Sequence, residues 1–536
     1  MMIGRITILL CIGRSTAFVI SRGWTQPPSI STCCYRPSVF VDASAPRKPA
    51  AHRTEASPRV PSAGVEVLAE PSTGADASSE PAVLLRNKTV VVARGKARLF
   101  WDGNPLVFGG SIAREEGNPA AGDVVDVVDS SGKFIAWGVY NPDSMYRVRV
   151  LAREGEPLAN TRDVETLVRA RLRTARDTRR VVGIPNTDTN TYRLVNGEGD
   201  RLSGLVVDVF ADVIGVSSSA VWVEVFRSEV EAALRQEFGA EATTIVWRRS
   251  DGRLQQDGWK GTGADTDAAG RGDSPVGLEG AAACATAGFE GDGGRAGGAW
   301  SETVGGGGKK RGFRDDVPAT VVRELGLEYE VRPQFGQKTG FYCDQRESRE
   351  AVRKLSQGKT VLDMFCYSGG FALNAAVGGA SRVLAVDSSQ PALEEARINA
   401  GRNGLDRVVE FVKDDALAFM KARRAAATTG DRFDVVVLDP PKLAPSKKSV
   451  ANATSRYRRL NAAAIKLVQP GGILVTFTCS AAMTQSGTFV GTVQSAAAAA
   501  GRTLTLLRTV GPAVDHVTNP CYPEGVYLTG VFFYVS

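Results

Sequence analysis

Polar residues recur at five places where a short apolar, β-branched segment ends. The first segment leads into Asp363-Met-Phe-Cys-Tyr-Ser-Gly-Gly370, the second ends at Asp387, and the third is followed by Asp414-Asp415. The fourth ends in Asp439-Pro-Pro-Lys442 and the fifth in Thr478-Cys-Ser480. Ligands of open α/β sheets bind at the carboxyl ends of the strands. The five turns could therefore build one site.

The types of these residues indicate the ligand. Asp387 could accept hydrogen bonds from both hydroxyls of a ribose, and Asp415 could bind an adenine amino group. The G-x-G-x-x-G spacing of a dinucleotide fold is absent, and neither an Asp-Pro-Pro nor a Thr-Cys-Ser turn has a role in hydride transfer. We therefore predict an S-adenosylmethionine site; the alternative is a set of internally satisfied turns. The predicted cofactor residues in these turns are Asp363, Phe365, Ser368, Gly369, Asp387, Asp415 and Asp439.

The segments around these turns alternate in the manner of a doubly wound, mostly parallel sheet. We predict strands at Thr360–Met364, Arg382–Asp387, Val408–Val412, Phe433–Leu438 and Gly472–Phe477, with helices at Phe371–Val377, Pro391–Asn403 and Asp415–Arg424. The expected fold of residues 313–536 is therefore α/β.

Two smaller modules are expected upstream. Residues 88–160 contain short β-rich runs separated by turn residues, which is typical of a small all-β barrel. Residues 161–250 indicate an α+β domain, with a helix at Thr161–Arg180, a hairpin at Leu205–Val216 that turns at Ala211-Asp212, and a helix at Val223–Leu234.

Three segments have the composition of unfolded chain. Residues 1–60 carry eight Lys/Arg against two acidic residues, as in a targeting leader, and residues 61–87 resemble a linker. Residues 251–312 hold 19 glycines and little aliphatic periodicity, so we expect a disordered insertion. Within the leader, Ile6–Ile12 followed by Ser-Thr-Ala-Phe18 favours a plastid over a mitochondrion; a spurious leader would leave the protein in the cytoplasm.

Composition limits the remaining possibilities. The chain has 536 residues and a net charge of +7, which suits several domains and an anionic partner. No apolar run reaches the roughly 18 residues of a membrane span. Eight cysteines without regular spacing and two histidines suggest neither a zinc site nor a disulfide framework. The sequence leaves the oligomeric state open, with a homodimer as one option.

Several of these motifs together resemble the bacterial 23S ribosomal RNA cytosine-5 methyltransferases of the large-subunit methyltransferase I type. They are Phe335-Gly-Gln-Lys-Thr-Gly-Phe-Tyr-Cys-Asp-Gln-Arg346, Val361–Phe371, Asp439–Lys442 and Thr478–Ser480. The resemblance implies an N-terminal PUA-like domain, a central domain, a Rossmann-like methyltransferase domain, and large-subunit rRNA as partner. It also implies that Gln337 and Phe341 contact the cofactor. The leader and the glycine-rich insertion depart from it.

The chemistry of such a reaction requires a thiol. Carbon 5 of a pyrimidine is a poor nucleophile until a thiolate adds at carbon 6. Cys479 is the best-placed thiol; its alternative role is a small buried hydrophobe, and Cys366 and Cys343 are weaker candidates. Asp439 would hydrogen-bond the base edge. Some RNA cytosine-5 methyltransferases carry a second cysteine where this chain has Lys442, so the base for product release stays unassigned.

A basic segment follows the Asp-Pro-Pro turn. We predict that it contacts RNA phosphates, with a solvated helix face as the alternative. Its residues are Lys442, Lys447, Lys448, Arg456, Arg458 and Arg459, with Tyr457 among them. His516 and Glu524 match the end segment of the family, where a structural and a catalytic role are both open.

These observations predict an S-adenosylmethionine-dependent enzyme that forms 5-methylcytidine in large-subunit rRNA without a metal. The alternatives are 5-methyluridine formation, methylation of a guanine nitrogen without a thiol, and a non-catalytic RNA-binding assembly factor.

Overall fold

The computed structural model describes residues 88–239, 244–261, 319–334, 339–426 and 432–536. The predicted leader, the linker, most of the glycine-rich insertion and Gln337 lie outside these ranges and stay predictions. No helix within the ranges is long and apolar enough to cross a membrane.

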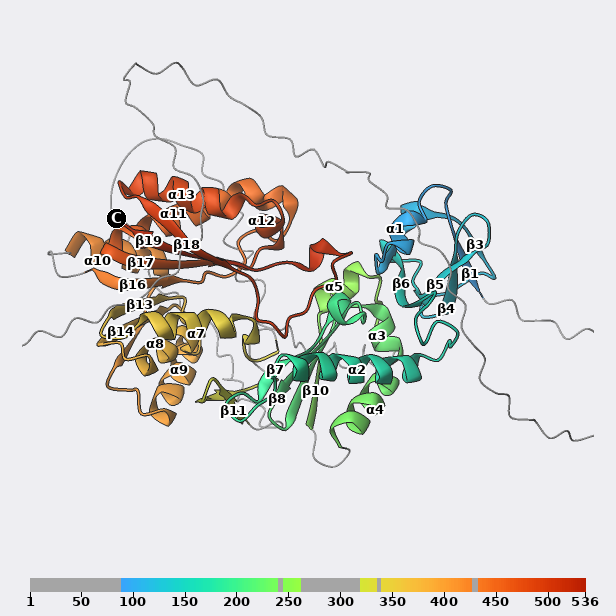
Figure 1. The fold of residues 1–536 in the computed structure, drawn as a ribbon, viewed down its shortest axis with the longest axis horizontal. Coiled ribbons are helices and arrows are strands. Elements are labelled where there is room, and N and C mark those ends of the chain that lie inside the picture. Colours follow the sequence, from blue (N-terminus) through green and yellow to red (C-terminus); the bar gives the residue numbers. More distant parts are fainter. Residues whose placement is uncertain (1–87, 240–243, 262–318, 335–338, 427–431) are drawn as a thin grey trace, which may run out of the picture. The chain divides into compact units, whose positions relative to one another are not determined.

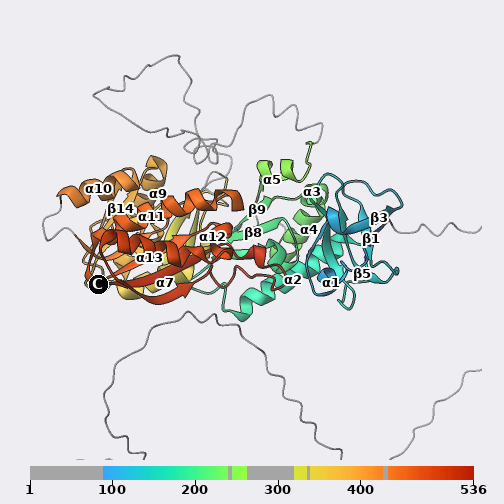
Figure 2. The ribbon, with the colours of Figure 1, turned by 90° about the horizontal axis from the view of Figure 1, so that it is seen from above.

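The first module is a six-stranded mixed sheet in the order β2-β6-β5-β4-β1-β3. Figure 2 shows β1, β3 and β5 of this sheet with helix α1 beside them. Its core includes Val90, Phe100 and Ile135, all nearly inaccessible to solvent. The elements are β1 (Thr89–Val92), α1 (Arg98–Trp101), β2 (Leu106–Phe108), η1 (Gly109–Ser111), β3 (Ile112–Glu116), β4 (Val124–Val128), β5 (Phe134–Tyr140) and β6 (Tyr146–Arg153). The β-rich character predicted for this region is confirmed.

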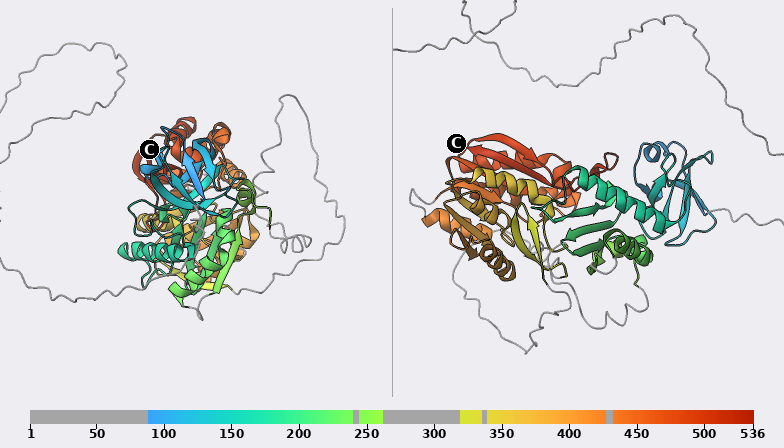
Figure 3. Two further views of the ribbon diagram at one scale, coloured as in Figure 1. Left: turned by 90° about the vertical axis from the view of Figure 1, so that its right-hand side faces the viewer. Right: turned by 60° about the horizontal axis from the view of Figure 1, so that its bottom comes forward.

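The second module is a four-stranded sheet in the order β10-β9-β8-β7, with α2 along one side, teal in Figure 3. Helix α2 begins three residues later than predicted because the Asp163 side chain caps it by accepting a hydrogen bond from the Glu165 N–H. Ala211 makes the predicted hairpin turn with a left-handed φ of 55°. The elements are α2 (Val164–Val181), β7 (Thr191–Asn196), η2 (Gly197–Asp200), β8 (Leu205–Phe210), β9 (Val213–Ser218), α3 (Val221–Val225), α4 (Arg227–Phe238) and β10 (Thr244–Arg249).

The third module contains a seven-stranded sheet in the order β15-β14-β13-β16-β17-β19-β18, in which β19 runs antiparallel to both of its neighbours. Three of the five predicted strands have the predicted bounds. Strand β15 is shifted by one residue, and β17 is longer than predicted, since it begins at Val468 and ends at Thr478. The strands are β13 (Thr360–Met364), β14 (Arg382–Asp387), β15 (Val409–Lys413), β16 (Phe433–Leu438), β17 (Val468–Thr478), β18 (Leu504–Val510) and β19 (Thr529–Val535).

Helices cover both faces of this sheet (Figure 1). Alternate strand residues face opposite layers: Val361 packs in the cluster with α7, α8 and α9, and Leu362 in the cluster with α10, α11 and α13. Strands buried on both faces read as continuous apolar runs, which is why they could be predicted closely. The remaining elements are η4 (Cys343–Gln345), α7 (Arg346–Leu355), α8 (Gly370–Val377), α9 (Gln390–Arg402), α10 (Ala416–Ala426), η5 (Lys447–Ser449), α11 (Val450–Leu467), α12 (Ala481–Gln485), α13 (Thr488–Ala500) and η6 (Pro523–Gly525).

Hydrogen bonds to the buried residue Asp515 connect the second and third modules, and buried ion pairs within the third module support them. The carboxylate of Asp515 accepts hydrogen bonds from Arg346 Nη2 and from the Arg193 backbone N–H, both at 2.9 Å. Arg179 Nη2 donates to the Asp515 carbonyl at 2.6 Å. Arg349 donates two bonds of 2.7 Å to Glu324, at the end of β11 (Thr320–Glu324), which pairs with β12 (Leu327–Val331). The C-terminal segment is thereby fixed to the four-stranded sheet.

The prediction of disorder from residue 251 is wrong for the first residues of the insertion. Helix α5 spans Asp251–Gln256, and Asp257 after it is buried. The Asp257 carboxylate accepts hydrogen bonds from Ser144 Oγ at 2.5 Å, Arg149 Nη2 at 2.9 Å and the Val221 N–H at 2.9 Å. These partners lie far away in the sequence, so local composition gave no sign of them.

Replacing Asp257 should therefore destabilise the first and second modules. Asp257→Ala leaves the buried Arg149 guanidinium without its carboxylate, which costs about 3–5 kcal/mol. Denaturant unfolding of the full chain measures the loss. Asp251→Ala, an exposed acidic residue on the same helix, is the matched control and should change the free energy of unfolding by less than about 0.5 kcal/mol. Equal effects of the two variants would contradict a bridging role for Asp257.

Candidate functional site

The structure brings the predicted acidic residues together at one edge of the seven-stranded sheet. Strand β13 lies between β14 and β16, in register at Met364↔Val386 and Met364↔Leu438. Asp363, Asp387 and Asp439 are therefore at neighbouring strand ends, at the point where ligands bind in sheets of this kind.

The turn after β13 is held in an unusual backbone conformation by β14. Phe365 and Tyr367 have left-handed φ angles of 64° and 48°, and Gly369 has 87°. The N–H groups of Phe365 and Cys366 donate to the Val386 carbonyl, and the Tyr367 N–H donates to Asp387 Oδ2 at 3.0 Å. Strain of this kind persists where the surroundings enforce it, often at ligand sites.

Asp363 is the most buried of the three carboxylates. Its Oδ2 accepts a hydrogen bond of 2.9 Å from the Ala372 N–H in the first turn of α8, whereas its buried Oδ1 has no hydrogen-bond partner. Burial, opposed by that hydrogen bond and reinforced by Asp439 and Asp387, raises the pKa of Asp363 to about 8. A buried acceptor without a partner is costly unless a ligand supplies a donor. The amino group of S-adenosylmethionine is a donor of the required kind.

The other predicted cofactor residues have distinct environments. Ser368 is buried and its carbonyl accepts a bond from Asn399 Nδ2 at 3.2 Å. At Gly369, a Cβ would lie 3.4 Å from the Ala396 side chain, so the turn passes close to α9. Asp415 is exposed, and its Oδ1 caps α10 by accepting from the Ala418 N–H. Phe341 packs in the core, with its ring 5.0 Å from that of Tyr329. Its predicted contact with the cofactor stays a prediction.

The thiol candidates differ in accessibility. Cys343 and Cys366 are buried, and burial raises the pKa of each thiol well above its usual value. Both are therefore poor sources of thiolate. Cys479, directly after β17, is half-buried. Strands β16 and β17 pair in parallel at Leu438↔Thr476, so Asp439 and Cys479 leave the sheet at the same edge.

Tyr457 supports the turn that carries Cys479. The Thr478 hydroxyl donates to Tyr457 Oη at 2.8 Å, and Ser480 Oγ lies 3.3 Å from the same oxygen. Ser480 Oγ also accepts from the Ala444 N–H at 3.0 Å. Tyr457 is fully buried, so it cannot stack on RNA as a member of the basic segment would; it instead braces both residues that flank Cys479.

The basic residues of that segment lie mostly on the surface. Lys447 and Lys448 are exposed on η5, Arg458 and Arg459 are exposed on α11, and Arg456 is half-buried there. Burial lowers the pKa of Lys442, and nearby Arg253 on α5 adds to this effect while Cys479 opposes it. The proximity of Arg253 to this turn was not predicted.

Two further residues of the site were missed. Gln345 Nε2 donates to Asp439 Oδ2 at 3.0 Å and so fixes the orientation of that carboxylate. The Tyr342 ring meets the Tyr367 ring edge-on at 5.4 Å. Burial and several acidic neighbours, Cys479 and Asp439 among them, raise the pKa of Tyr342. Both residues belong to the Phe335–Arg346 stretch, which was the available signal.

His516 lies in the ion-pair cluster rather than at the strand ends. It is buried, and its Nδ1 is 2.9 Å from Asp515 Oδ1. Glu524 is exposed, and its carbonyl accepts from Gln485 Nε2 at 3.0 Å. These contacts favour the structural role for both. The described residues include no group of three or more side chains suited to hold a metal ion.

Comparison with known families agrees with this arrangement. Residues 90–153 match the PUA-like domain family, and residues 316–503 match the S-adenosylmethionine-dependent methyltransferase family. The predicted fold class and the predicted cofactor are confirmed by these matches.

Curated relatives match most of the chain. Ribosomal RNA large subunit methyltransferase I of Aeromonas hydrophila is 33% identical over 444 residues, covering 83% of this chain and 98% of the relative. The protein of that name from Escherichia coli is 33% identical over 443 residues, covering 82% and 98%.

Solved structures show the same fold. A putative methyltransferase complexed with SAH has a TM-score of 0.62 at 18% identity, over 83% of this chain and 99% of that one. A putative SAM-dependent methyltransferase from Streptococcus mutans has a TM-score of 0.60 at 18% identity, with the same shares covered.

The burial of Asp363 predicts a pH-dependent stability. Because the pKa is raised from 3.8 to about 8 on folding, the folded protein binds one more proton between these values, and stability falls as pH rises through this window. Asp363→Asn removes this dependence. In thermal unfolding of the cofactor-free protein, the Tm of the variant relative to the Tm of the wild type should therefore rise from about pH 4 to pH 8. Asp406→Asn, at an exposed position, is the control, and a constant difference between wild type and Asp363→Asn would refute the assignment.

Proposed function

The chain belongs to the ribosomal RNA large subunit methyltransferase I family, and from this premise we propose that it methylates carbon 5 of a cytosine in large-subunit rRNA. The observation that carries the proposal is the placement of Cys479, a half-buried thiol, at the same sheet edge as Asp439. The turn after β13, residues 365–369, lies at this edge as well and is called the cofactor turn below. Methylation of a guanine nitrogen has no use for such a thiol.

The chain's residues divide the chemistry between them. S-adenosylmethionine, when bound, would supply an electrophilic methyl group and, as the bond from that methyl group to sulfur breaks, would leave as the neutral thioether S-adenosylhomocysteine. The Cys479 thiolate adds to carbon 6 of the base, and the electron pair released to carbon 5 forms the new carbon–carbon bond. Loss of the proton on carbon 5 then expels the thiolate and restores the ring. Asp439, oriented by Gln345 at 3.0 Å, holds the base edge while charge develops on the ring.

The cofactor is held by the β13 turn and the strand ends beside it. Asp387 is positioned for the ribose hydroxyls, since each of its oxygens already accepts one backbone N–H and retains a second lone pair. Asp363 Oδ1 is available to a donor of the methionine portion. The left-handed turn at Gly369 lets the backbone approach the ligand closely.

The decisive experiment incubates the full chain with S-adenosylmethionine and in vitro transcribed large-subunit rRNA. Bisulfite sequencing of the product should show protection of one cytosine. Methyl transfer to a uracil or a guanine would replace the proposal with that alternative. Cofactor binding without any transfer, to naked rRNA or to ribosomal particles, would support an assembly factor.

Removal of the thiol should stop the reaction. Cys479→Ala should lower methyl transfer by at least about 10³-fold and leave cofactor affinity in calorimetry unchanged. RNA carrying 5-fluorocytidine should trap a covalent complex with the wild type, because fluorine cannot leave carbon 5 as a cation. Cys521→Ser, at an exposed cysteine, is the control and should retain both properties. Full activity of Cys479→Ala would exclude the covalent mechanism.

Loss of the Tyr457 hydroxyl should slow the reaction without weakening binding. Tyr457→Phe leaves the Thr478 and Ser480 hydroxyls without their shared partner, so Cys479 is less well oriented and kcat should fall about tenfold to a hundredfold. KM for RNA and the yield of trapped complex at long times should stay near wild type. Tyr534→Phe, at an exposed tyrosine, is the control. An unchanged kcat would show that the hydroxyl serves packing alone.

A further inference from the structure

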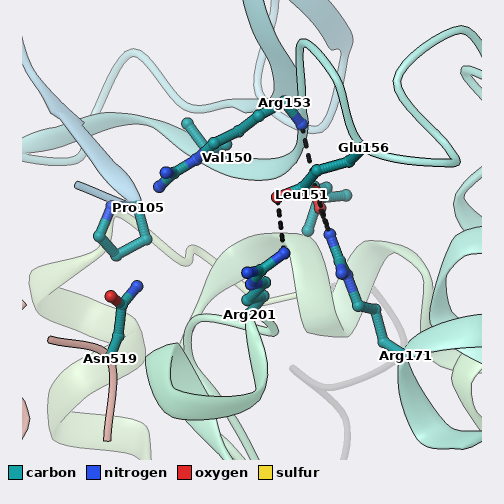
Figure 4. Close-up of a pocket in the computed structure, with 8 residues that line it drawn as sticks. All are labelled: Pro105, Val150, Leu151, Arg153, Glu156, Arg171, Arg201 and Asn519. Carbon is teal, nitrogen blue, oxygen red and sulfur yellow. Dashed lines mark hydrogen bonds and ion pairs between the residues drawn. The ribbon is translucent and has the colours of Figure 1, made fainter. Parts of the chain in front are cut away.

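A small hollow away from the cofactor turn is lined by arginines (Figure 4). Its lining comes from strand β6 and the segments before β2 and after β6, from α2 and the end of η2, and from the C-terminal segment. The residues are Pro105, Val150, Leu151, Arg153, Glu156, Arg171, Arg201 and Asn519. None of these residues takes part in the site at the carboxyl ends of the strands.

The charges in the hollow are unbalanced. Glu156 is its one carboxylate, against three guanidinium groups. Arg171 Nη2 lies 2.5 Å from Glu156 Oε2, and Arg201 Nη1 lies 2.6 Å from Glu156 Oε1. Both carboxylate oxygens are thus engaged, and two positive charges of the lining remain without a matching anion.

The Arg153 side chain is fixed at the edge of the hollow. Arg153 Nη2 donates to the Gly103 carbonyl, which anchors the side chain beside Pro105. Burial lowers the pKa of Arg153, and nearby Arg201 lowers it further against the opposing effect of Glu156. An anion entering the hollow would relieve the repulsion between the guanidinium groups.

The size of the hollow restricts the ligand. Its volume of about 10 Å³ holds one water-sized group. A nucleobase is far too large, whereas one oxygen of a phosphate fits, with the rest of the group outside. Guanidinium groups are the donors best matched to phosphate.

We propose that this arginine hollow binds one phosphate of the RNA backbone and so anchors the substrate RNA outside the methyl-transfer site. The inference rests on the proposed function, because it takes RNA as the substrate. Free inorganic phosphate shares the chemistry and is the competing source of the ligand.

The test compares two arginines of equal exposure. Arg201 has a side-chain exposure of 54% and pairs with Glu156, while Arg180, outside the hollow, has 55% and pairs with Asp177. Binding of catalytically inactive Cys479→Ala protein to large-subunit rRNA is measured by filter binding over a series of salt concentrations. Arg201→Gln should reduce the slope of log Kd against log salt by about one, and Arg180→Gln should not. Equal slopes for the two variants would overturn the proposal.

Two additional measurements separate the remaining explanations. Glu156→Gln removes the competing carboxylate and should tighten RNA binding; weaker or unchanged binding, with a lowered Tm, would mean that the cluster only holds the fold together. Sodium phosphate and sodium chloride at equal ionic strength are compared for their effect on Tm. A phosphate-specific rise that Arg201→Gln abolishes, combined with an unchanged RNA slope, would assign the hollow to free phosphate instead. Methyl transfer by the wild type is assayed in parallel, so failure of the proposed function is seen independently.

Discussion

The structure depends on a set of charges that are buried together. Asp515 is inaccessible to solvent, and it is stable there because Arg346 and the Arg193 N–H donate to its carboxylate. Removing a charge from water costs several kcal/mol, and the cost is recovered only where the partners are complete. Arg346 opens α7 and directly follows Gln345, which contacts Asp439. The position of Asp439 in the site is thus tied to an ion pair outside it.

The same arrangement separates buried from accessible thiols. Cys343, shortly before Arg346 in the sequence, is buried, and burial raises the pKa of its thiol. Cys366 lies in the turn after β13 and is buried as well, which raises the pKa of its thiol. Cys479 follows a strand whose end is braced by Tyr457, and its exposure is intermediate. Of these three cysteines, the fold therefore leaves only Cys479 partly accessible to a substrate.

The sequence predicted the five parallel strands of the third module well, but it did not predict β18, β19 or the contacts between distant segments. Strands such as Phe433–Leu438 are apolar on both faces, and that pattern is local, so their bounds could be read directly. The contact of Gln345 with Asp439 joins residues 94 apart, and no local pattern encodes it. The bracing role of Tyr457 was not predicted, because its neighbours are basic and exposed while its own side chain is buried. Helix α5 was missed because the residues that bind Asp257 precede it by 36 to 113 positions.

The hydrogen bonds to Asp515 also set an order of events during synthesis. Arg179 can pair early with Asp200, but its hydrogen bond to the Asp515 carbonyl joins residues 336 positions apart and must wait for the end of the chain. The four-stranded sheet can form its backbone ladder early, but its charged face is complete only after residue 515 has left the ribosome. A protein whose proposed substrate is ribosomal RNA thus reaches its native contacts only as its own translation comes to an end.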